Sequence, residues 1–422
     1  MPWKQKLEWV KQMSKALRSA LSHFEQKNAE LCIGGKQISE IVRDCPVPCY
    51  LYDTATLNWR YRTLKQDLPQ NISINYAVKA NSNHQVLVEL SRLYDGFDIA
   101  SKGEMTKALD AGIKPEQMSF AGPGKSVEEL RFAVEHKIGT ISIENEREIE
   151  HLINICDETG AKARVLIRVN PDFELSKSGM KMGGGPKQFG IDSERIPEIV
   201  KSICREKLLG FEGIHIFAGS QNLNATSILE AFGNIIDYAS ELATVIDAPI
   251  RTLNLGGGFG IPYFANDDEL DVEHVGKGLG ELIGAVGKPL NNTKFKIELG
   301  RFIVGECGIY VSRVLYRKLS RGHVFLVLNG GMHHHLAASG NFGQSVVRRP
   351  MPVTVVNKLD NPTEKVNIVG PLCTPLDTFG MNVEIPRAEE GDLIAVLNSG
   401  AYGYSASPLG FLSHELPIEC LL

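Results

Sequence analysis

The segment Ile72-Ser73-Ile74-Asn75-Tyr76-Ala77-Val78-Lys79-Ala80-Asn81 is the most informative stretch of the chain. Its first residues alternate with β-branched and aromatic side chains, which is typical of a buried strand. Lys79 follows at the strand end, in an apolar patch where its ammonium would be poorly solvated, and desolvation lowers the pKa of a lysine. A neutral lysine amine is a nucleophile that can form a Schiff base. Taken alone, however, a lysine at a strand end is usually a solvated surface charge, and only the rest of the chain favours the nucleophile.

Composition excludes several classes of function. The chain has 422 residues, 43% of them apolar and 23% charged, and a net charge of −5, which favours an ordinary globular protein and no nucleic-acid partner. It contains no long apolar run and no signal-peptide core, so we expect a cytoplasmic protein with no membrane span. The eight cysteines are scattered. We therefore expect reduced thiols, and no metal knuckle at Cys45 and Cys49.

The order of apolar segments predicts an α/β fold in which an eight-stranded βα barrel of the TIM type precedes a C-terminal, mostly antiparallel β domain. Eight short strand candidates, most of them followed by a helix-length segment, provide the count that such a barrel needs. They are residues 73–78, 96–100, 118–121, 140–143, 163–169, 213–217, 252–255 and 294–298. Strand patterns with turn residues follow at 324–329, 353–356, 366–369 and 393–397.

These patterns divide the chain into a barrel over residues 47–300 and a β domain over residues 31–46 and 301–422. Residues 1–30 are expected to be separate, with an amphipathic helix over 3–28 whose first half is basic. This helix could cap the body of the protein or dock an acidic partner. The Gly- and Lys-rich loop 176–188 could close over a ligand or be a plain surface connection.

Several motifs follow Lys79 in a fixed order. A strand ends in His215 and leads to Ser220, a second strand enters the glycine loop 256–260, and the run 297–301 reads Ile-Glu-Leu-Gly-Arg. Cys373-Thr374-Pro375-Leu376-Asp377 and Gly400-Ala401-Tyr402-Gly403 come last. In wording and order these motifs resemble the fold-type III pyridoxal-phosphate decarboxylases, the family of ornithine, diaminopimelate and arginine decarboxylases. The resemblance runs from about residue 31 to the C-terminus.

The resemblance implies pyridoxal 5'-phosphate as cofactor and a role for each motif. Lys79 would form the Schiff base, Glu298 would face the pyridine nitrogen, and His215 would lie against the ring. Cys373 would donate a proton to the substrate from the other subunit of a homodimer. The remaining residues implied to hold or support the cofactor are Asp98, Glu104, Arg168, Ser220, Gly257, Gly258, Gly300, Arg301 and Tyr402.

The substrate is inferred from acidic residues that the chain lacks. Family members that act on free diamino acids have an acid directly after the cysteine, where this chain has Thr374, and ornithine-type enzymes have another near Gly330. Arg301 and Arg349 suit an anionic substrate instead, with Thr374 and Asp377 nearby. We therefore expect an L-amino acid whose distal end is acidic, acylated or tethered to an acyl-carrier protein.

The sequence around Cys373 is most similar to that of a sub-branch that contains carrier-protein-tethered glutamyl decarboxylases and siderophore-pathway decarboxylases. Three histidines, His333 to His335, are expected to alternate faces along a strand, so a metal site is not expected. The alternatives are a diaminopimelate-type decarboxylase of a free diamino acid, an amino-acid racemase on the same barrel, and a non-catalytic binding protein.

Overall fold

The structure is a computed structural model that describes residues 13–172, 180–181, 185–217, 219–340 and 349–422. The chain forms two compact units. The barrel unit comprises Tyr61–Gly260 and Leu270–Gly300, and the β unit comprises Met1–Arg60, Ile261–Glu269 and Arg301–Leu422.

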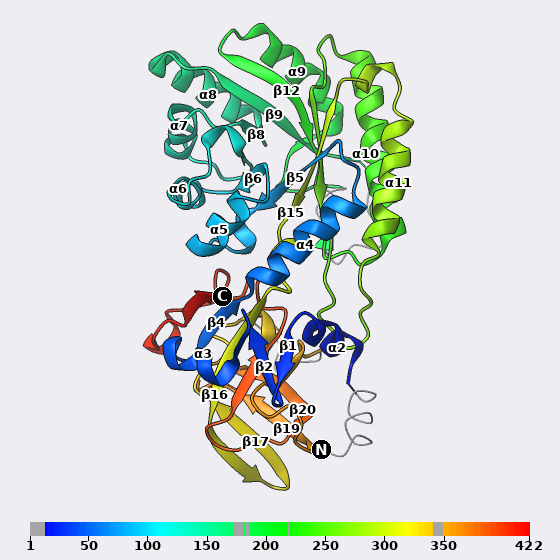
Figure 1. The fold of residues 1–422 in the computed structure, drawn as a ribbon. Coiled ribbons are helices and arrows are strands. Elements are labelled where there is room, and N and C mark those ends of the chain that lie inside the picture. The colour runs from blue at the N-terminus through cyan, green and yellow to red at the C-terminus, as the bar shows by residue number, and fades with distance from the viewer. Residues whose placement is uncertain (1–12, 173–179, 182–184, 218, 341–348) are drawn as a thin grey trace. The chain divides into compact units, whose positions relative to one another are not determined.

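The barrel unit is built on a closed barrel of eight parallel strands, with helices outside them (Figure 1). Each strand pairs with the next in the order β5-β6-β7-β8-β9-β12-β14-β15, and β15 pairs with β5 to close the ring. The strands are β5 (Ile72–Ala77), β6 (Gly96–Ile99), β7 (Met118–Phe120), β8 (Thr140–Ile143), β9 (Ala163–Asn170), β12 (Leu209–His215), β14 (Thr252–Gly257) and β15 (Lys294–Leu299). The predicted barrel is confirmed, strand by strand.

Short elements add to this ring. β11 (Ile191–Asp192) pairs with β9, and β10 (Met180–Lys181) pairs with β13 (Gly219–Ser220). The outer helices are α5 (His84–Ser91), α6 (Lys102–Asp110), α7 (Val127–Glu135), α8 (Glu146–Thr159), α9 (Ile196–Arg205), α10 (Ala225–Val245) and α11 (Val272–Gly284), and α4 (Thr54–Asp67) joins the two units. Single 3-10 turns are η1 (Val78–Ala80), η2 (Pro115–Gln117), η3 (Ser193–Arg195) and η4 (Lys288–Leu290).

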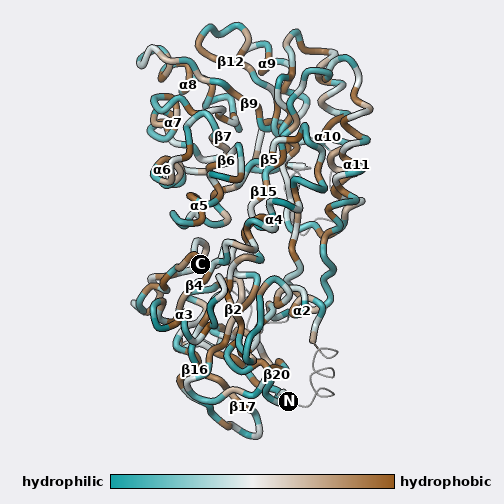
Figure 2. Tube along the Cα trace, in the orientation of Figure 1, coloured by the Kyte–Doolittle hydropathy of each residue, from teal (hydrophilic) through white to brown (hydrophobic). Residues whose placement is uncertain are grey.

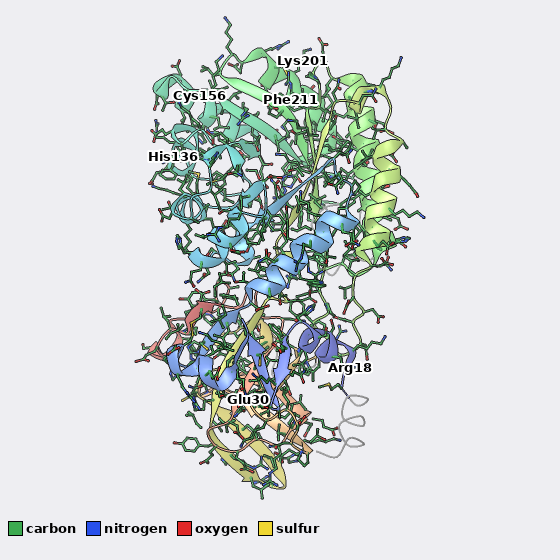
Figure 3. All side chains as sticks on the ribbon, viewed as in Figure 1. Arg18, Glu30, His136, Cys156, Lys201 and Phe211 are labelled. Atoms are coloured by element: carbon green, nitrogen blue, oxygen red, sulfur yellow. A yellow bond between two sulfur atoms is a disulfide. The ribbon has the colours of Figure 1, made fainter. Side chains whose placement is uncertain are left out.

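Helix α8 shows how local sequence sets these outer helices. The Asn145 side chain caps its N-terminus by accepting from the Glu148 amide, and Gly160 ends it with φ +66°. Ile149 and Leu152 recur at helical spacing and face inward. Hydrophobic and hydrophilic residues mix along the outer helices in the same way (Figure 2). Two labelled side chains in Figure 3, Cys156 on α8 and Phe211 on β12, are buried in this core.

The β unit is built on a mostly antiparallel sheet, as predicted. Its strand order is β18-β21-β16-β17-β19-β20, while β4 pairs with both β16 and β22. The strands are β4 (Cys49–Tyr52), β16 (Gly308–Ser320), β17 (His323–Leu328), β18 (Val353–Val355), β19 (Thr363–Val369), β20 (Thr378–Pro386), β21 (Leu393–Val396) and β22 (Ile418–Leu421). A small second sheet holds β1 (Glu25–Lys27), β2 (Glu30–Ile33) and β3 (Lys36–Gln37). The unit also has α2 (Lys15–Ser22), α3 (Ile38–Asp44), α12 (Arg301–Val304), η5 (Ala337–Ser339) and η6 (Phe411–Ser413).

The structure corrects two expectations about the secondary structure of this unit. A helix through residue 28 is wrong: α2 ends at Ser22, and β1 then turns back onto β2 through Asn28 and Ala29, both with positive φ. The first residues of the expected helix, 1–12, lie outside the described residues. The histidines 333–335 do not lie on a strand either, because backbone bonds from His334 and His335 to the Gly331 carbonyl fold them into a turn.

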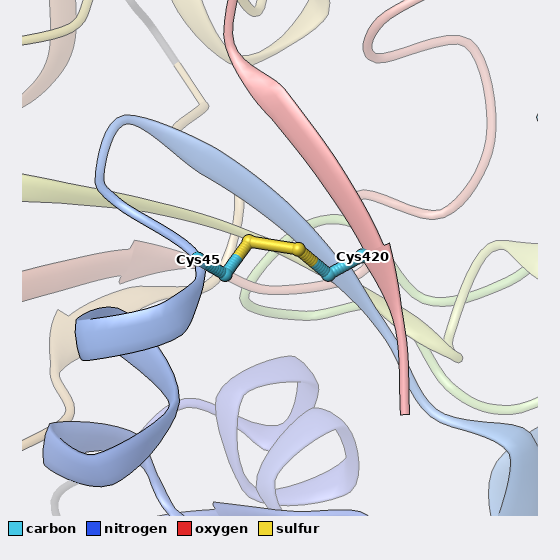
Figure 4. The surroundings of a disulfide bond; sticks show 2 residues. All are labelled: Cys45 and Cys420. Atoms are coloured by element: carbon cyan, nitrogen blue, oxygen red, sulfur yellow. A yellow bond between two sulfur atoms is a disulfide. The ribbon is translucent and has the colours of Figure 1, made fainter.

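A disulfide between Cys45 and Cys420 overturns the expectation that all thiols are reduced (Figure 4). The two residues are 375 positions apart. Cys45 directly follows α3, and parallel pairing of β22 with β4 brings Cys420 beside that segment. Spacing along the sequence therefore offered no sign of the pair.

Candidate active site

Polar side chains crowd the inside of the barrel, where apolar branched residues are usual. Those at or near the C-terminal strand ends include Asp98, Ser142, Arg168, His215, Asn254 and Glu298, each buried. Such groups are costly to bury unless they have partners. They therefore mark this end of the barrel as the candidate site.

Lys79 lies on the single turn η1 directly after β5, at the C-terminal end of that strand. Its Nζ is 3.6 Å from Asp98 Oδ2, and 5.9 Å from the centre of the Phe217 ring. The expected poor solvation of this lysine is wrong, because its side chain is 47% exposed. Its amine is reachable and lies beside a buried carboxylate.

Two buried carboxylates, those of Asp98 and Glu298, interact with the charge of Lys79. Burial, and then the nearby Glu298 carboxylate, raise the pKa of Asp98 to about 7, against the opposing effects of Lys79 and Arg168. Burial also raises the pKa of Glu298, while the charge of Lys79 and a hydrogen bond from Asn254 Nδ2 lower it. The amine of Lys79 thus stabilises both anions.

His215 ends β12 inside the same cluster. Its Nδ1 is 3.0 Å from Ser142 Oγ, and its Nε2 is 3.5 Å from Glu298 Oε2. Burial, with a further contribution from the charge of Arg168, lowers the pKa of His215 to about 3. The imidazole is therefore neutral, and its contact with Glu298 is not an ion pair.

Arg168 is fixed by Glu144, a residue that the motifs did not single out. Its Nη1 donates to Glu144 Oε1 at 2.8 Å, and its guanidinium stacks on Phe189 at 4.8 Å. Glu144 also accepts from the Gly122 and Gly190 amides. The acid follows β8 directly, so its place at a C-terminal strand end was the one signal that could have found it.

The loop at the end of β14 requires glycines because other backbone segments lie too close to it for a side chain. Gly257 pairs with Glu298, and a Cβ there would lie 1.8 Å from the Glu298 carbonyl oxygen. Gly258 has φ +98°, and a Cβ there would lie 2.4 Å from the Gly219 oxygen and 3.7 Å from Ser220 Cα. The loop therefore presents backbone without side chains next to Ser220. Gly300 is similarly crowded, because a Cβ added there would lie 2.9 Å from the Ala80 Cβ.

The β unit holds the remaining predicted residues. Arg301 Nη1 donates to the Tyr263 hydroxyl at 3.2 Å, and the guanidinium lies over the rings of Tyr263 and Tyr402. Arg301 Nε is buried and has no hydrogen-bond partner within the described ranges. Arg349 stacks on Phe264 at 4.4 Å. Both arginines thus rest on aromatic faces, with Arg301 and Tyr402 brought together.

The Cys373 segment is a tight loop. Cys373 is an exposed free thiol, and the Thr374 hydroxyl accepts from the Leu376 amide. Asp377 is buried, and its two oxygens accept from the Met332 and Leu372 amides at 2.6 and 2.8 Å. These bonds show that Asp377 organises the loop, and its predicted contact with the substrate stays a prediction.

Two further expectations concern ligands and membranes. In the described part of the chain, no group of three His, Cys, Asp or Glu side chains could hold a metal ion. No described helix is both long and apolar enough to cross a membrane. Most of the loop 176–188 lies outside the described residues. Its expected closure over a ligand therefore stays a prediction.

Known proteins are similar to this chain in sequence and in fold. Residues 54–305 match the family described as "Pyridoxal-dependent decarboxylase, pyridoxal binding domain". The chain is 37% identical over 394 residues to the L-glutamyl-[BtrI acyl-carrier protein] decarboxylase of Niallia circulans, covering 91% of each chain. It is 32% identical to the 2-[(L-alanin-3-ylcarbamoyl)methyl]-2-hydroxybutanedioate decarboxylase of Staphylococcus aureus, covering 88% of this chain and 93% of that one.

A solved structure extends the likeness to three dimensions. Diaminopimelate decarboxylase from Helicobacter pylori, complexed with L-lysine, aligns with a TM-score of 0.80 at 29% identity, covering 91% of this chain and 93% of that chain.

Proposed function

The chain belongs to the pyridoxal-dependent decarboxylases, and from that membership we propose that it decarboxylates an L-amino acid whose distal end is acidic, acylated or tethered to a carrier protein. The family assigns the enzyme class and the cofactor, pyridoxal phosphate. The substrate and the roles of individual residues are the proposal.

The barrel residues fit this cofactor. Asp98 Oδ1 and His215 Nε2 are buried without hydrogen-bond partners among the described residues, as expected of polar atoms that meet a ligand. Bare backbone at Gly257 and Gly258 suits the close approach of a phosphate. Lys79 would hold the cofactor's aldehyde carbon, and Glu298 its ring nitrogen.

When bound, pyridoxal phosphate supplies an electron sink for the bond broken at the substrate's α-carbon. An ionised Glu298, favoured by the nearby charges of Lys79 and Arg168, would keep a positive ring nitrogen in place. Neutral His215 offers a flat, uncharged ring. Asp98 lies within reach of the Lys79 amine and, with a pKa of about 7, can hold or release a proton near it.

The packing around Gly330 carries the proposal for the substrate. A Cβ at Gly330 would lie 1.9 Å from the buried Tyr310 hydroxyl and 2.9 Å from Pro48 Cβ. An acidic side chain therefore has no room there, and Thr374 supplies none after the cysteine. A distal ammonium would lose charge-assisted contacts worth ~1.5–3 kcal/mol each. That corresponds to roughly 10- to 150-fold in selectivity.

The relatives support the same substrate class. One is named for a glutamyl group on an acyl-carrier protein, and another for a carbamoyl-linked alanine. Both names describe amino acids whose distal or carboxyl end is conjugated. Two cationic side chains, Arg301 and Arg349, suit the anionic groups of such substrates.

The deciding experiment is a substrate panel followed by mass spectrometry for loss of the carboxyl group. Free ornithine, lysine and diaminopimelate are compared with glutamate, N-acylated diamino acids and carrier-tethered glutamate. We expect turnover of an acidic or conjugated member, and none by the Lys79→Ala variant. Efficient turnover of the free diamino acids would instead establish the diaminopimelate-type alternative. Racemisation without carbon dioxide release would establish the racemase.

We further propose that the active enzyme is a homodimer in which the exposed Cys373 acts in the partner's site. Each shared site would need Lys79 from one subunit and Cys373 from the other, so Lys79→Ala and Cys373→Ala should each inactivate the homodimer. Mixing the two inactive variants would then restore activity, to about a quarter of the native value if subunits exchange freely. Full inactivity of mixtures in which differently tagged subunits co-purify, and which therefore contain heterodimers, would refute shared sites.

A further inference from the structure

A cavity opens at the opposite end of the barrel strands from Lys79. Its volume is about 810 Å³, within the range of pockets that hold small organic ligands. It is lined by the first residues of several strands, among them Ser73 on β5, Thr140 on β8 and Lys294 on β15. This end of such a barrel ordinarily serves stability, and the proposed reaction does not use it.

The charges lining this cavity do not balance. Four cationic side chains face two carboxylates, and they are Arg164, Arg251, Lys294 and Lys296 against Glu116 and Glu212. In the described part of the chain, Arg164, Lys294 and Lys296 form no ion pair with any carboxylate. The two lysines alternate with Glu298 along β15, so they lie on the barrel's interior side. The cavity thus carries an excess of positive charge.

Polar groups without partners also line it. Ser119 is 6% exposed, and its hydroxyl is buried with no hydrogen-bond partner among the described residues. Lys296 is partly buried, and burial lowers its pKa. A buried hydroxyl and a partly buried lysine are each costly unless a ligand or water completes their bonding.

We propose that this cavity is a binding site for a small polar anion that carries at least two phosphate or carboxylate groups. The excess of two positive charges balances a dianion and would also attract a trianion, and the Ser119 hydroxyl adds a neutral donor. Arg164 and Arg251 can each bind an oxyanion in bidentate fashion, while Lys294 and Lys296 act as point charges. The volume favours a ligand larger than a single phosphate.

The site is separate from the catalytic one. On β15, Lys294 and Lys296 precede Glu298 toward the N-terminal end, whereas Lys79 follows the C-terminal end of β5. Binding there would therefore neither require nor displace the cofactor. The cofactor-loaded enzyme can be used for every measurement, since the cofactor phosphate would then occupy the glycine loop under the proposed function.

Calorimetric titration of the loaded enzyme with inorganic pyrophosphate, citrate and acetate tests the proposal. We expect saturable binding of pyrophosphate or citrate and none of acetate, and the preferred one of the two identifies phosphate or carboxylate chemistry. Arg164→Gln combined with Lys296→Met should weaken binding about tenfold or more. Lys162→Gln, which changes a lysine one residue before β9 and outside the cavity lining, should leave the affinity unchanged.

A second measurement needs no variant. Limited acetylation, mapped by mass spectrometry, should show that pyrophosphate or citrate protects Lys294 and Lys296 but not Lys162. Absence of binding by all three anions overturns the proposal. So does equal protection of the three lysines, or an affinity that the double variant leaves intact while it still binds its cofactor.

Discussion

At the scale of single residues, the candidate site contains buried ionisable groups whose pKa values are shifted from their ordinary values. Asp98 and Glu298 are buried beside one exposed amine, that of Lys79, and beside Arg168. Since burial, and then the Glu298 carboxylate, disfavour the ionised form of Asp98, its pKa rises to about 7 and it retains its proton up to neutral pH. A group poised in this way can exchange a proton with Lys79 at physiological pH.

This raised pKa has a consequence for stability. The folded pKa of Asp98, about 7, exceeds its ordinary value of 3.8. The contribution of Asp98 to stability is therefore full below pH 3.8 and is lost as pH rises toward 7, by about 1.4 kcal/mol for each pH unit. The amide in an Asp98→Asn variant does not ionise, so the variant escapes this loss. In the cofactor-free protein, the variant's melting temperature should rise relative to native between about pH 4 and pH 7 and level off above that.

The matched control is Asp110→Asn, which changes an acid on α6 that is not buried. Its difference from native should stay constant over the same pH range. If Asp98→Asn also shows a constant difference, then Asp98 is ionised throughout the range and the proton-sharing role fails.

At the scale of elements, the glycine loop after β14 illustrates how backbone shape makes a binding surface. Gly258→Ala would place a methyl group 2.4 Å from the Gly219 oxygen at φ +98°. Strain of about 1–3 kcal/mol is typical of a non-glycine residue in such a conformation. We expect affinity for pyridoxal phosphate, measured by absorbance titration, to fall about tenfold or more.

Gly284→Ala provides the comparison, because Gly284 ends α11 with nothing within 4 Å of an added Cβ. Alanine is the better helix former, so this variant should keep native cofactor affinity and equal or higher stability. Unchanged affinity in Gly258→Ala would exclude the loop from the phosphate site.

Elements were predictable from sequence wherever the local pattern matched the local burial. All eight barrel strands were found because each is a short apolar run bounded by turns, as with residues 140–143 and β8. β16 was missed because its second half is largely exposed and carries charges such as Arg317 and Lys318, so its 13 residues show no single pattern. Glu144 was missed because its importance lies in partners from three other segments, which no spacing encodes.

At the scale of the whole chain, the Cys45–Cys420 disulfide closes a loop that spans nearly the entire sequence. Joining residues 375 apart restricts the unfolded chain strongly. Native disulfides of this kind typically contribute ~2–4 kcal/mol. The bond also ties β22, the last strand, to the segment that precedes β4.

Thiol counting on the denatured, unreduced protein tests this bond directly. Two of the eight cysteines are paired, so six should react, namely Cys32, Cys49, Cys156, Cys204, Cys307 and Cys373. Cys45→Ser with Cys420→Ser should lower the melting temperature, whereas Cys204→Ser, at an exposed free thiol, should not. Reducing agent should lower native stability to that of the double variant. Eight reactive thiols in protein purified without reductant would show that the pair is reduced, as expected for a cytoplasmic protein.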